Sequence, residues 1–486
     1  MRSEALRERL AAGGLLVRWP ERLPAEFAGV TTNSARVRPG MLFMAYAGST
    51  TDAHEFVGDA AGAGAAAAVV EHAVDGVALP LIEVANGRHA ASVAAALDAG
   101  DPARSLQLLA VTGTNGKTTT VHVLRHLFGG DAPAASIGTL GAVDGSGAVL
   151  PGTESLTTPG PVELHTTLAT LRECGVRTVA MEASSHSLDQ DRLYGLAFRA
   201  AVFTNLTRDH LDYHRTQDAY FAAKAKLVAL LEADGWLIVN ADDPAWQLLP
   251  KHANRLTFAV RGAADVRATD VEGDARGMRF RIAAQGKSAR VALPLIGGFN
   301  VENALGAAAA ALALGQDLGQ VAERLASVPQ VPGRMERLAD SPCVVLRDYA
   351  HTPDALERAL AALRPLTAGR LIVVFGAGGD RDRGKRSVMG GIAARDADLA
   401  VVTSDNPRTE PPGQILDEIE AGMGDVPHLR VVDRRQAIAR AISISRPDDT
   451  VLLAGKGHET YQVVGHDKLP LDERDIVAET VKATAR

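Results

Sequence analysis

Residues 106–119 read LQLLAVTGTNGKTT, and this stretch decides the fold. Its apolar first half is typical of a buried strand and its glycine-rich middle of a tight loop, while the following residues place Val121 and Leu124 on one face of a helix. Glycines let backbone N–H groups turn inward around phosphate oxygens, and the helix N-terminus adds partial positive charge. Lys117 can then reach terminal phosphates, and Thr118 can ligate Mg²⁺. The stretch therefore predicts nucleotide binding.

The loop is a variant of the strict phosphate-loop pattern, because Val111 stands where that pattern has its first glycine. An ordinary glycine-rich turn capped by Thr114 or Asn115 is the alternative, but it leaves the consecutive Lys-Thr-Thr unexplained. We expect the nucleotide loop to consist of Gly113, Thr114, Asn115, Gly116, Lys117, Thr118 and Thr119.

The composition limits the partners of the chain. Its 486 residues are enough for about three domains. The 51 basic and 58 acidic residues give a net charge of −7, which argues against a nucleic-acid backbone or an anionic membrane surface as the main partner. Aromatic residues make up 4%, too few for a base-stacking surface. Cys174 and Cys343 cannot form a disulfide framework and lack zinc-site spacing, so we expect a reducing compartment.

The apolar runs are too short for membrane insertion, because a span needs roughly 20 residues. The longest runs, residues 60–70 and 304–315, are bounded by charged or amide side chains. Residues 10–17 imitate a signal-peptide core, but acidic residues precede them and no small-residue cleavage site follows. We interpret them as a helix end that leads into a strand, and we expect a cytoplasmic protein.

Short runs rich in Val, Ile and Leu alternate with longer Ala/Leu stretches from Gln107 onward, the pattern of βαβ units on parallel sheets. The expected strands are 106–111, 177–181, 200–203 and 236–239, then 344–346, 371–375, 399–403 and 450–453. A Pro/Gly break at residues 331–333 separates these two series, and residues 101–102 read as an earlier linker. In the first hundred residues, 59–70 read as a helix feeding a buried strand. The expected fold class is α/β.

Several motifs are similar, in type and in order, to the landmarks of the Mur ligases, the cytoplasmic enzymes that add amino acids to the UDP-linked peptidoglycan precursor. The nucleotide loop GTNGKTT is followed by MEASSH at 181–186, NLTRDHLDYH at 205–214, FNVENA at 299–304, PGRME at 332–336 and DYAHTP at 348–353. These motifs span nearly the whole chain. The resemblance implies a UDP-binding α/β domain at 1–102, a P-loop ATPase domain with a mostly parallel sheet at 103–335, and a Rossmann-like domain at 336–486 that brings the amino acid.

The resemblance also implies a reaction. In this family ATP phosphorylates a carboxylate, and an amine attacks the resulting acyl phosphate, because phosphate is a good leaving group. The segment SDNPR at 404–408 resembles the signature of members that add meso-2,6-diaminopimelate to the D-glutamate γ-carboxylate of UDP-MurNAc-L-Ala-D-Glu. Such an enzyme supplies cell-wall synthesis and hence cell shape and division. We expect it to act as a monomer.

The magnesium site is expected to join hard oxygen ligands, with one softer partner that only the resemblance supports, His210. By resemblance the ligands are Thr118, Glu182, His210 and Lys224, the last as a carbamate. A partly desolvated lysine loses its proton more easily, and the neutral amine can add CO₂. Lys226 has the same composition around it, so the residues alone leave the choice between the two lysines open. Lys117, Lys224, Glu182 and His210 are the expected catalytic residues.

The remaining sites also come from the resemblance. The contacts to the base and ribose of ATP are expected at Asn303, Arg334 and Asp348. The amino-acid acceptor is expected at Arg381, Asp405, Asn406, Pro407, Arg408, Gly455 and Glu459. The distal centre of diaminopimelate carries an ammonium and a carboxylate, so Arg408 and Glu459 would recognise both, whereas lysine would leave Arg408 without its carboxylate. The alternative is that Asp-Asn-Pro-Arg forms a turn and binds nothing.

The UDP-sugar peptide is expected to contact the first two domains at Thr32, Ser34, Leu156, Thr157, Thr158, Ser184, Gln190 and Arg192. Two positions depart from the family pattern here. Asn33-Ser34-Ala35 stands for the usual Asp-Ser-Arg, and Ala53 replaces a frequent glycine. Serine and threonine in loops are also common turn formers, which is the alternative for Thr32 and Ser34.

Four other functions are alternatives to this hypothesis. A lysine-adding member or an enzyme similar to folylpolyglutamate synthetase would share the ATPase design but use another acceptor. A P-loop switch would use nucleotide without ligation. A zinc hydrolase is disfavoured, because no glutamate lies between His210 and His214 in the H-E-x-x-H arrangement, and Gln462 replaces the second histidine after His458-Glu459.

Overall fold

The computed structural model describes residues 1–48, 51–130, 132–154, 156–274 and 276–484. The chain divides into two compact units, one made of Met1–Arg267 with Glu302–Asp317 and the other of Ala268–Val301 with Leu318–Arg486. Each main sheet has helices packed on it, so the α/β class predicted from the sequence is confirmed. Among the described helices, none combines the length and apolar character needed to cross a membrane.

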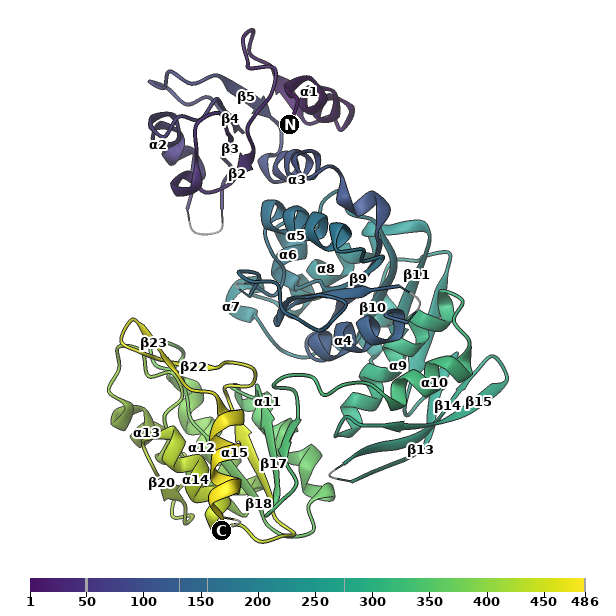
Figure 1. Cartoon of the computed structure of the whole chain (residues 1–486), viewed down its shortest axis with the longest axis vertical. Coiled ribbons are helices and arrows are strands. Elements are labelled where there is room, and N and C mark those ends of the chain that lie inside the picture. The colour runs from purple at the N-terminus through teal and green to yellow at the C-terminus, as the bar shows by residue number, and fades with distance from the viewer. Residues whose placement is uncertain (49–50, 131, 155, 275, 485–486) are drawn as a thin grey trace. The chain divides into compact units, whose positions relative to one another are not determined.

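The first sheet has five strands in the order β1-β5-β4-β3-β2. These are β1 (Leu16–Arg18), β2 (Val30–Thr31), β3 (Leu42–Met44), β4 (Ala67–Val70) and β5 (Leu81–Val84). Helices α1 (Ser3–Ala12) and α3 (Gly87–Asp98) pack on one face, and α2 (Val57–Gly62) packs on the other (Figure 1). The predicted helix-to-strand transitions at residues 10–17 and 59–70 are confirmed, since α1 leads into β1 and α2 leads into β4.

The central sheet of the first unit is parallel around β6, with the neighbours β12-β11-β10-β6-β9-β7-β8. Its strands are β6 (Gln107–Thr112), β7 (Ala134–Gly138), β8 (Gly141–Val143), β9 (Thr178–Glu182), β10 (Phe198–Phe203), β11 (Leu231–Asn240) and β12 (Arg255–Ala259), and β12 pairs with the first residues of β13 (Val266–Asp274). Helix α5 (Pro161–Glu173) packs on one face through Leu164 and Leu168. Helix α4 (Lys117–Phe128) buries Leu124 and Leu127. The predicted strands are confirmed to within a few residues.

Shorter helices follow β9 and β10. They are α6 (Ser185–Asp189), α7 (Leu211–His214) and α8 (Gln217–Ala225), and α9 (Gly298–Ala313) follows much later in the chain. Helix α8 is short. It starts where Thr216 caps the N-terminus, and it gives way to a 3₁₀ turn at Lys226–Leu230 that places Leu227 in the core before β11 begins.

The second unit holds a six-stranded sheet in the order β16-β17-β21-β18-β19-β20. Its strands are β16 (Glu336–Ala339), β17 (Val344–Asp348), β18 (Leu371–Phe375), β19 (Leu399–Val402), β20 (Leu429–Arg430) and β21 (Thr450–Ala454). One face carries α11 (Pro353–Leu363), α12 (Gly384–Asp396) and α13 (Pro412–Glu420), and the other carries α14 (Arg434–Ser443) and α15 (Glu473–Thr484) (Figure 1). Two hairpin-like pairs, β14 (Gly277–Ala284) with β15 (Lys287–Leu293) and β22 (Tyr461–Val464) with β23 (Asp467–Pro470), and helix α10 (Leu318–Ala326) complete the unit.

Candidate active site

The predicted nucleotide loop lies at the carboxyl edge of the central parallel sheet. It follows β6, which lies between β10 and β9 and is parallel to both. Glu182 ends β9, and Thr204 and Asn205 follow β10 directly. Ligands of open parallel sheets bind outside these strand ends, so the fold gathers the predicted phosphate and magnesium groups where chemistry is expected.

Two glycines of the loop adopt backbone conformations that other residues avoid. Gly113 has a φ of 147° and Gly116 a φ of 84°. A Cβ atom at Gly113 would lie 1.9 Å from Thr204 Oγ1, and one at Gly116 would lie 2.1 Å from Asn303 Oδ1. The backbone of the loop therefore approaches two neighbouring segments more closely than any side chain permits.

We expect Gly116→Ala to lower the free energy of unfolding by about 2–4 kcal/mol and to weaken ATP binding, because the added methyl group meets Asn303 and the left-handed conformation becomes strained. Gly195→Ala is the matched control: Gly195 has a φ of 82°, but a Cβ there meets nothing within 4 Å. Thermal unfolding and ATP titration calorimetry measure both effects. If Gly116→Ala and Gly195→Ala lose the same free energy of unfolding, backbone strain alone explains the loss, and the contact with Asn303 does not contribute.

The two residues that follow β10 hold the nucleotide loop in place through hydrogen bonds. Asn205 Oδ1 accepts a hydrogen bond of 3.0 Å from the Asn115 N–H, and the Thr114 N–H donates to the Asn205 carbonyl at 2.7 Å. Thr204 Oγ1 donates to the Asn115 carbonyl at 2.7 Å. The loop is thus held in its shape before any ligand binds, which reduces the cost of ordering it around phosphate.

Two lysines meet at one carbonyl of the loop. Lys117 Nζ donates to the Gly113 and Thr114 carbonyls at 3.0 and 2.9 Å, and Lys224 Nζ donates to the Gly113 carbonyl at 2.7 Å. Lys224 is only 1% exposed and lies over the ring of Tyr220. Burial lowers the pKa of Lys224 well below its ordinary value, and the charge of Lys117 lowers it further. Lys226, by contrast, is exposed beside Asp189.

Glu182 is a buried carboxylate at the end of β9, with an exposed fraction of 1%. Its Oε1 accepts a hydrogen bond from the Thr139 N–H at 2.8 Å, and its Oε2 accepts one from Thr139 Oγ1 at 3.3 Å. A Cβ atom at Gly138 would lie 2.2 Å from Oε1, so glycine is needed there to leave room for the carboxylate. These contacts orient Glu182 at the same sheet edge as the nucleotide loop.

His210, the residue before α7, belongs to a cluster of histidine rings with His186 of α6 and His214 of α7. Its ring centroid lies 4.8 Å from that of His186, and the rings of His186 and His214 are 5.5 Å apart. Burial lowers the pKa of all three imidazoles, so the neutral, metal-binding form is favoured. Of the three, His210 alone was predicted as a magnesium ligand, and His186, which ends the motif MEASSH, was given no role.

The predicted UDP-sugar residues of the central sheet form a connected group. Thr158 Oγ1 donates to the Glu182 carbonyl at 2.7 Å, and Ser184 caps α6 by accepting from the Ser187 N–H. Arg192 donates to the Thr158 carbonyl at 2.9 Å and to Gln190 Oε1 at 2.6 Å. Thr157 contacts Thr139 Oγ1 at 3.2 Å, while the side chain of Leu156 is exposed.

The N-terminal candidates lie in a turn after β2. Ser34 begins a 3₁₀ turn at Ser34–Arg36, and Asn33 Oδ1 accepts from the Ala35 N–H at 3.0 Å. Thr32 is half-buried beside this turn. Local hydrogen bonds explain the turn without a ligand, so the uridine contacts stay a prediction.

In the second unit, Arg334 and Asp348 lie near Tyr349. The guanidinium of Arg334 stacks over the Tyr349 ring with its carbon 4.9 Å from the ring centroid, and Asp348 Oδ2 accepts from the Met335 N–H at 2.8 Å. Burial raises the pKa of Asp348, although the nearby Arg334 opposes the shift. Asp348 ends β17, at the carboxyl edge of the second parallel sheet.

The predicted acceptor residues gather at that same edge, on loops after the neighbouring strands β21, β18 and β19. Asn406 accepts from Lys456 Nζ at 2.8 Å and donates to Glu459 Oε2 at 3.0 Å. Lys456 also donates to Glu459 at 2.7 Å and is fully buried. Lys456 was not among the residues predicted from the sequence, because a lysine between two glycines gives no local sign of burial.

The other acceptor candidates adjoin this group. A Cβ atom at Gly455 would lie 2.4 Å from Asp405 Oδ2, and one at Gly379 would lie 1.9 Å from the Pro407 carbonyl oxygen. The Arg408 N–H donates to the Val463 carbonyl at 3.0 Å. Arg381 is exposed, and its Nη1 lies 3.4 Å from the Asp380 carbonyl. Asp405, Asn406, Pro407, Arg408, Gly455 and Glu459 are therefore brought together.

A phosphate-type loop on one parallel sheet and a cluster of acceptor candidates on another define a multidomain α/β enzyme of the P-loop class. Two family models match the chain: the Mur ligase middle domain over residues 111–311, and the Mur ligase glutamate ligase domain over residues 333–457. The chain belongs to the Mur ligase family.

Relatives within this family narrow the comparison further. The UDP-N-acetylmuramoyl-L-alanyl-D-glutamate--2,6-diaminopimelate ligase of Gloeobacter violaceus is 43% identical over 98% of both chains. The enzyme of the same name from Geobacillus kaustophilus is 41% identical over 94% of this chain and 95% of its own. A solved structure of a ligase of that name superposes with a TM-score of 0.69, at 32% identity over 97% of both chains.

Proposed function

We propose that this protein is an ATP-dependent ligase that joins meso-2,6-diaminopimelate to the D-glutamate γ-carboxylate of UDP-MurNAc-L-Ala-D-Glu. The near-full-length similarity to ligases named for diaminopimelate supports this function. The observation that carries it is the acceptor cluster, in which Glu459 is hydrogen-bonded to Asn406, two residues before Arg408. In the proposal, the Glu459 carboxylate binds the ammonium and the Arg408 guanidinium binds the carboxylate at the distal centre of diaminopimelate.

The chemistry requires a carboxylate to become an electrophile. In the proposed reaction the γ-carboxylate attacks the γ-phosphorus of ATP, ADP leaves, and the amine of diaminopimelate then displaces phosphate from the acyl phosphate. The first step brings two anions together, so fixed positive charge is needed at the reacting phosphate. Loop N–H groups and Lys117 supply it, and Lys117 exchanges its present carbonyl partners for phosphate oxygens.

Magnesium is part of this proposal, with Thr118, Glu182, His210 and a carbamate on Lys224 as its ligands. The residues fit the ion: Glu182 is a buried carboxylate oriented by Thr139, and the low pKa of Lys224 favours the neutral amine that can add CO₂. A carbamate would also turn an amine buried near Lys117 into an anion. When bound, the ion supplies positive charge beside the phosphates.

The remaining assignments complete the proposal. Asn303, Arg334 and Asp348 bind the base and ribose of ATP, and the group around Thr158 and Arg192 binds the UDP-sugar peptide together with Thr32 and Ser34. We assign residues 1–102 to the UDP-binding domain, 103–335 to the ATPase domain and 336–486 to the amino-acid domain. We further propose that the protein acts in the cytoplasm as a monomer.

An acceptor screen tests this function. We expect release of ADP only when UDP-MurNAc-L-Ala-D-Glu and an acceptor are both present, with kcat/KM for meso-diaminopimelate at least about 100-fold above that for L-lysine, because lysine leaves Arg408 without a partner. ADP release that ignores both substrates would identify a nucleotide switch. Preference for L-lysine would identify the lysine-adding relative, and activity only with a folate acceptor would point to folylpolyglutamate synthesis.

A further inference from the structure

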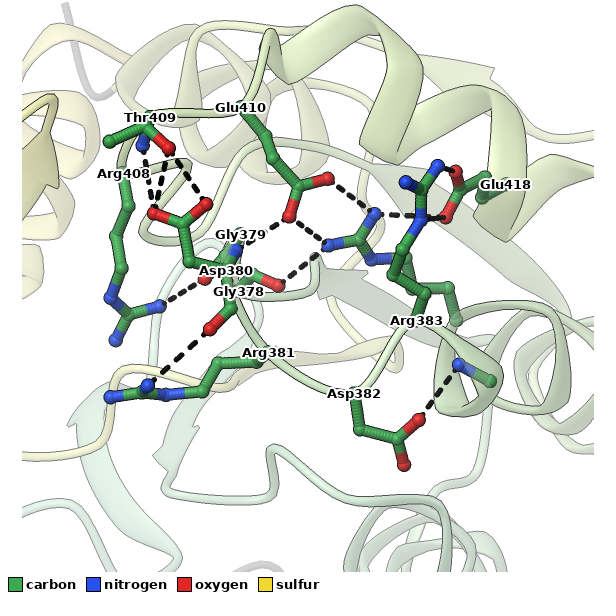
Figure 2. A network of polar contacts seen from close by, with 12 residues as sticks. Gly378, Gly379, Asp380, Arg381, Asp382, Arg383, Arg408, Thr409, Glu410 and Glu418 are labelled. Atoms are coloured by element: carbon green, nitrogen blue, oxygen red, sulfur yellow. Dashed lines mark hydrogen bonds and ion pairs between the residues drawn. The ribbon is translucent and has the colours of Figure 1, made fainter.

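The loop that carries Arg381 and the segment that carries Arg408 are joined by a network of charged groups (Figure 2). We call this network the polar clasp, and it consists of Asp380, Arg386, Thr409, Glu410 and Glu418. The loop follows β18 and the segment follows β19, so the clasp crosses between neighbouring strand ends. None of these five residues was among the candidates from the sequence.

A buried arginine anchors the clasp. Arg386 lies in the first turn of α12 and has an exposed fraction of 0%. It binds Glu410 through two parallel hydrogen bonds of 2.9 Å and Glu418 through one of 2.8 Å. It also donates to the Gly378 carbonyl at 3.1 Å. A bidentate pair of this kind fixes direction as well as distance, so Glu410 has a single orientation.

Glu410 in turn fixes the loop that carries Arg381. Its Oε1 accepts the Asp380 N–H at 2.5 Å. The carboxylate of Asp380 returns to the other segment, where it accepts from Thr409 Oγ1 at 2.8 Å and from the Thr409 N–H at 3.1 Å. Asp380 has a φ of 53°, a conformation that persists only where the surroundings determine it. The hydrogen bond from Arg386 lowers the pKa of Glu410 to about 2, so this carboxylate stays ionised at neutral pH.

The two arginines sit directly on this frame. Arg381 follows Asp380, and Arg408 precedes Thr409 with a φ of 50°. Arg408 Nη1 donates to the Gly379 carbonyl at 2.8 Å, and Figure 2 shows both guanidinium groups on the same side of the loop. The clasp is complete without any acceptor, so the two segments that carry the arginines are held together before the amino acid arrives.

We propose that Asp380, Thr409 and Glu410 are positioning residues that set the spacing of Arg381 and Arg408 for the two ends of a zwitterionic acceptor. This inference rests on the proposed ligase function. A preformed pair of guanidinium groups loses less conformational freedom on binding, and this gain appears in acceptor affinity while the phosphoryl-transfer step is untouched.

The test compares Thr409→Val with Thr409→Ser. Thr409 is exposed, so neither variant disturbs the core, and only valine removes the hydroxyl bond to Asp380. We expect Thr409→Val to raise the KM for meso-diaminopimelate about 5- to 10-fold, with the KM for ATP and kcat within about twofold, and Thr409→Ser to behave as the wild type. Glu410→Gln should raise the same KM about 10- to 100-fold. Arg395→Gln, which breaks exposed ion pairs in the last turn of α12, is the control.

Hydrogen exchange gives a second readout that does not depend on turnover. Amides of residues 378–382 should exchange about tenfold faster in Glu410→Gln, because the Asp380 N–H loses a charged acceptor. If Thr409 were important only for folding, Thr409→Val would lower the active fraction and kcat without changing the KM for meso-diaminopimelate. An unchanged KM in active Thr409→Val enzyme therefore overturns the inference. Wild-type enzyme without diaminopimelate-dependent turnover would instead refute the proposed function, and the positioning role would fall with it.

Discussion

Lys224→Ala is expected to reduce ligase turnover by at least about 10³-fold, the largest effect of any single replacement considered for this protein. The side chain is 1% exposed, its amine lies 2.7 Å from the Gly113 carbonyl of the nucleotide loop, and the low pKa favours the form that adds CO₂. If the carbamate holds magnesium, its loss leaves Glu182 as the one anionic side chain among the proposed ligands. Steady-state ADP release with both substrates measures the loss.

The neighbouring lysine provides the control for this experiment. Lys226→Ala removes an exposed ammonium beside Asp189 and should leave turnover within about twofold. Short carboxylic acids added to Lys224→Ala should restore part of the activity, whereas bicarbonate should not, because no amine remains. A ¹³C NMR carbamate signal after incubation with labelled bicarbonate should appear in wild type and Lys226→Ala only. Unchanged turnover in Lys224→Ala would remove this residue from the magnesium site.

Arg408→Lys is expected to raise the KM for meso-diaminopimelate about 30- to 100-fold while the KM for ATP stays within about twofold. The planar guanidinium can hold a carboxylate through two parallel hydrogen bonds, and an ammonium offers only a point charge. Arg408 has a φ of 50°, and lysine and arginine are alike at Cβ, so we expect the same backbone strain with either residue and the comparison isolates the end of the side chain. Initial-rate kinetics with each substrate varied in turn measure the two constants.

The matched control is Arg358→Lys, which alters an exposed ion pair with Asp354 within α11. We expect no change in either constant there, because exposed helix pairs contribute little. Equal loss of affinity for ATP and diaminopimelate in Arg408→Lys would contradict its role in acceptor binding. A large rise for diaminopimelate but not for ATP would support that role.

Local pattern was sufficient for the strands and for the nucleotide loop. Apolar runs that end in glycine predict buried parallel strands, and the loop after β6 lies where its residues indicated. The local composition could not distinguish Lys224 from Lys226, because both stand on one short helical stretch. Burial separates them: Lys224 points to the Gly113 carbonyl, while Lys226 meets carboxylates at the surface.

Contacts between distant segments could not be predicted from spacing. Gly116 leaves room for Asn303, which is far along the chain, and Asn205 supports the loop from another strand end. The polar clasp depends on Arg386 and Glu410, which in sequence look like ordinary surface charges. Such pairs become visible only when parallel strands bring successive loops to one edge.

The proposed nucleotide loop and the proposed acceptor arginines follow strands of separate sheets, and each sheet has a hydrophobic core of its own. Mutations in the loops after β18, β19 and β21 can therefore accumulate without disturbing the core beneath the proposed ATP site. Natural selection can therefore change which amine is joined while the use of ATP stays the same. This separation permits a series of related ligases that share one way of using ATP and join different amines.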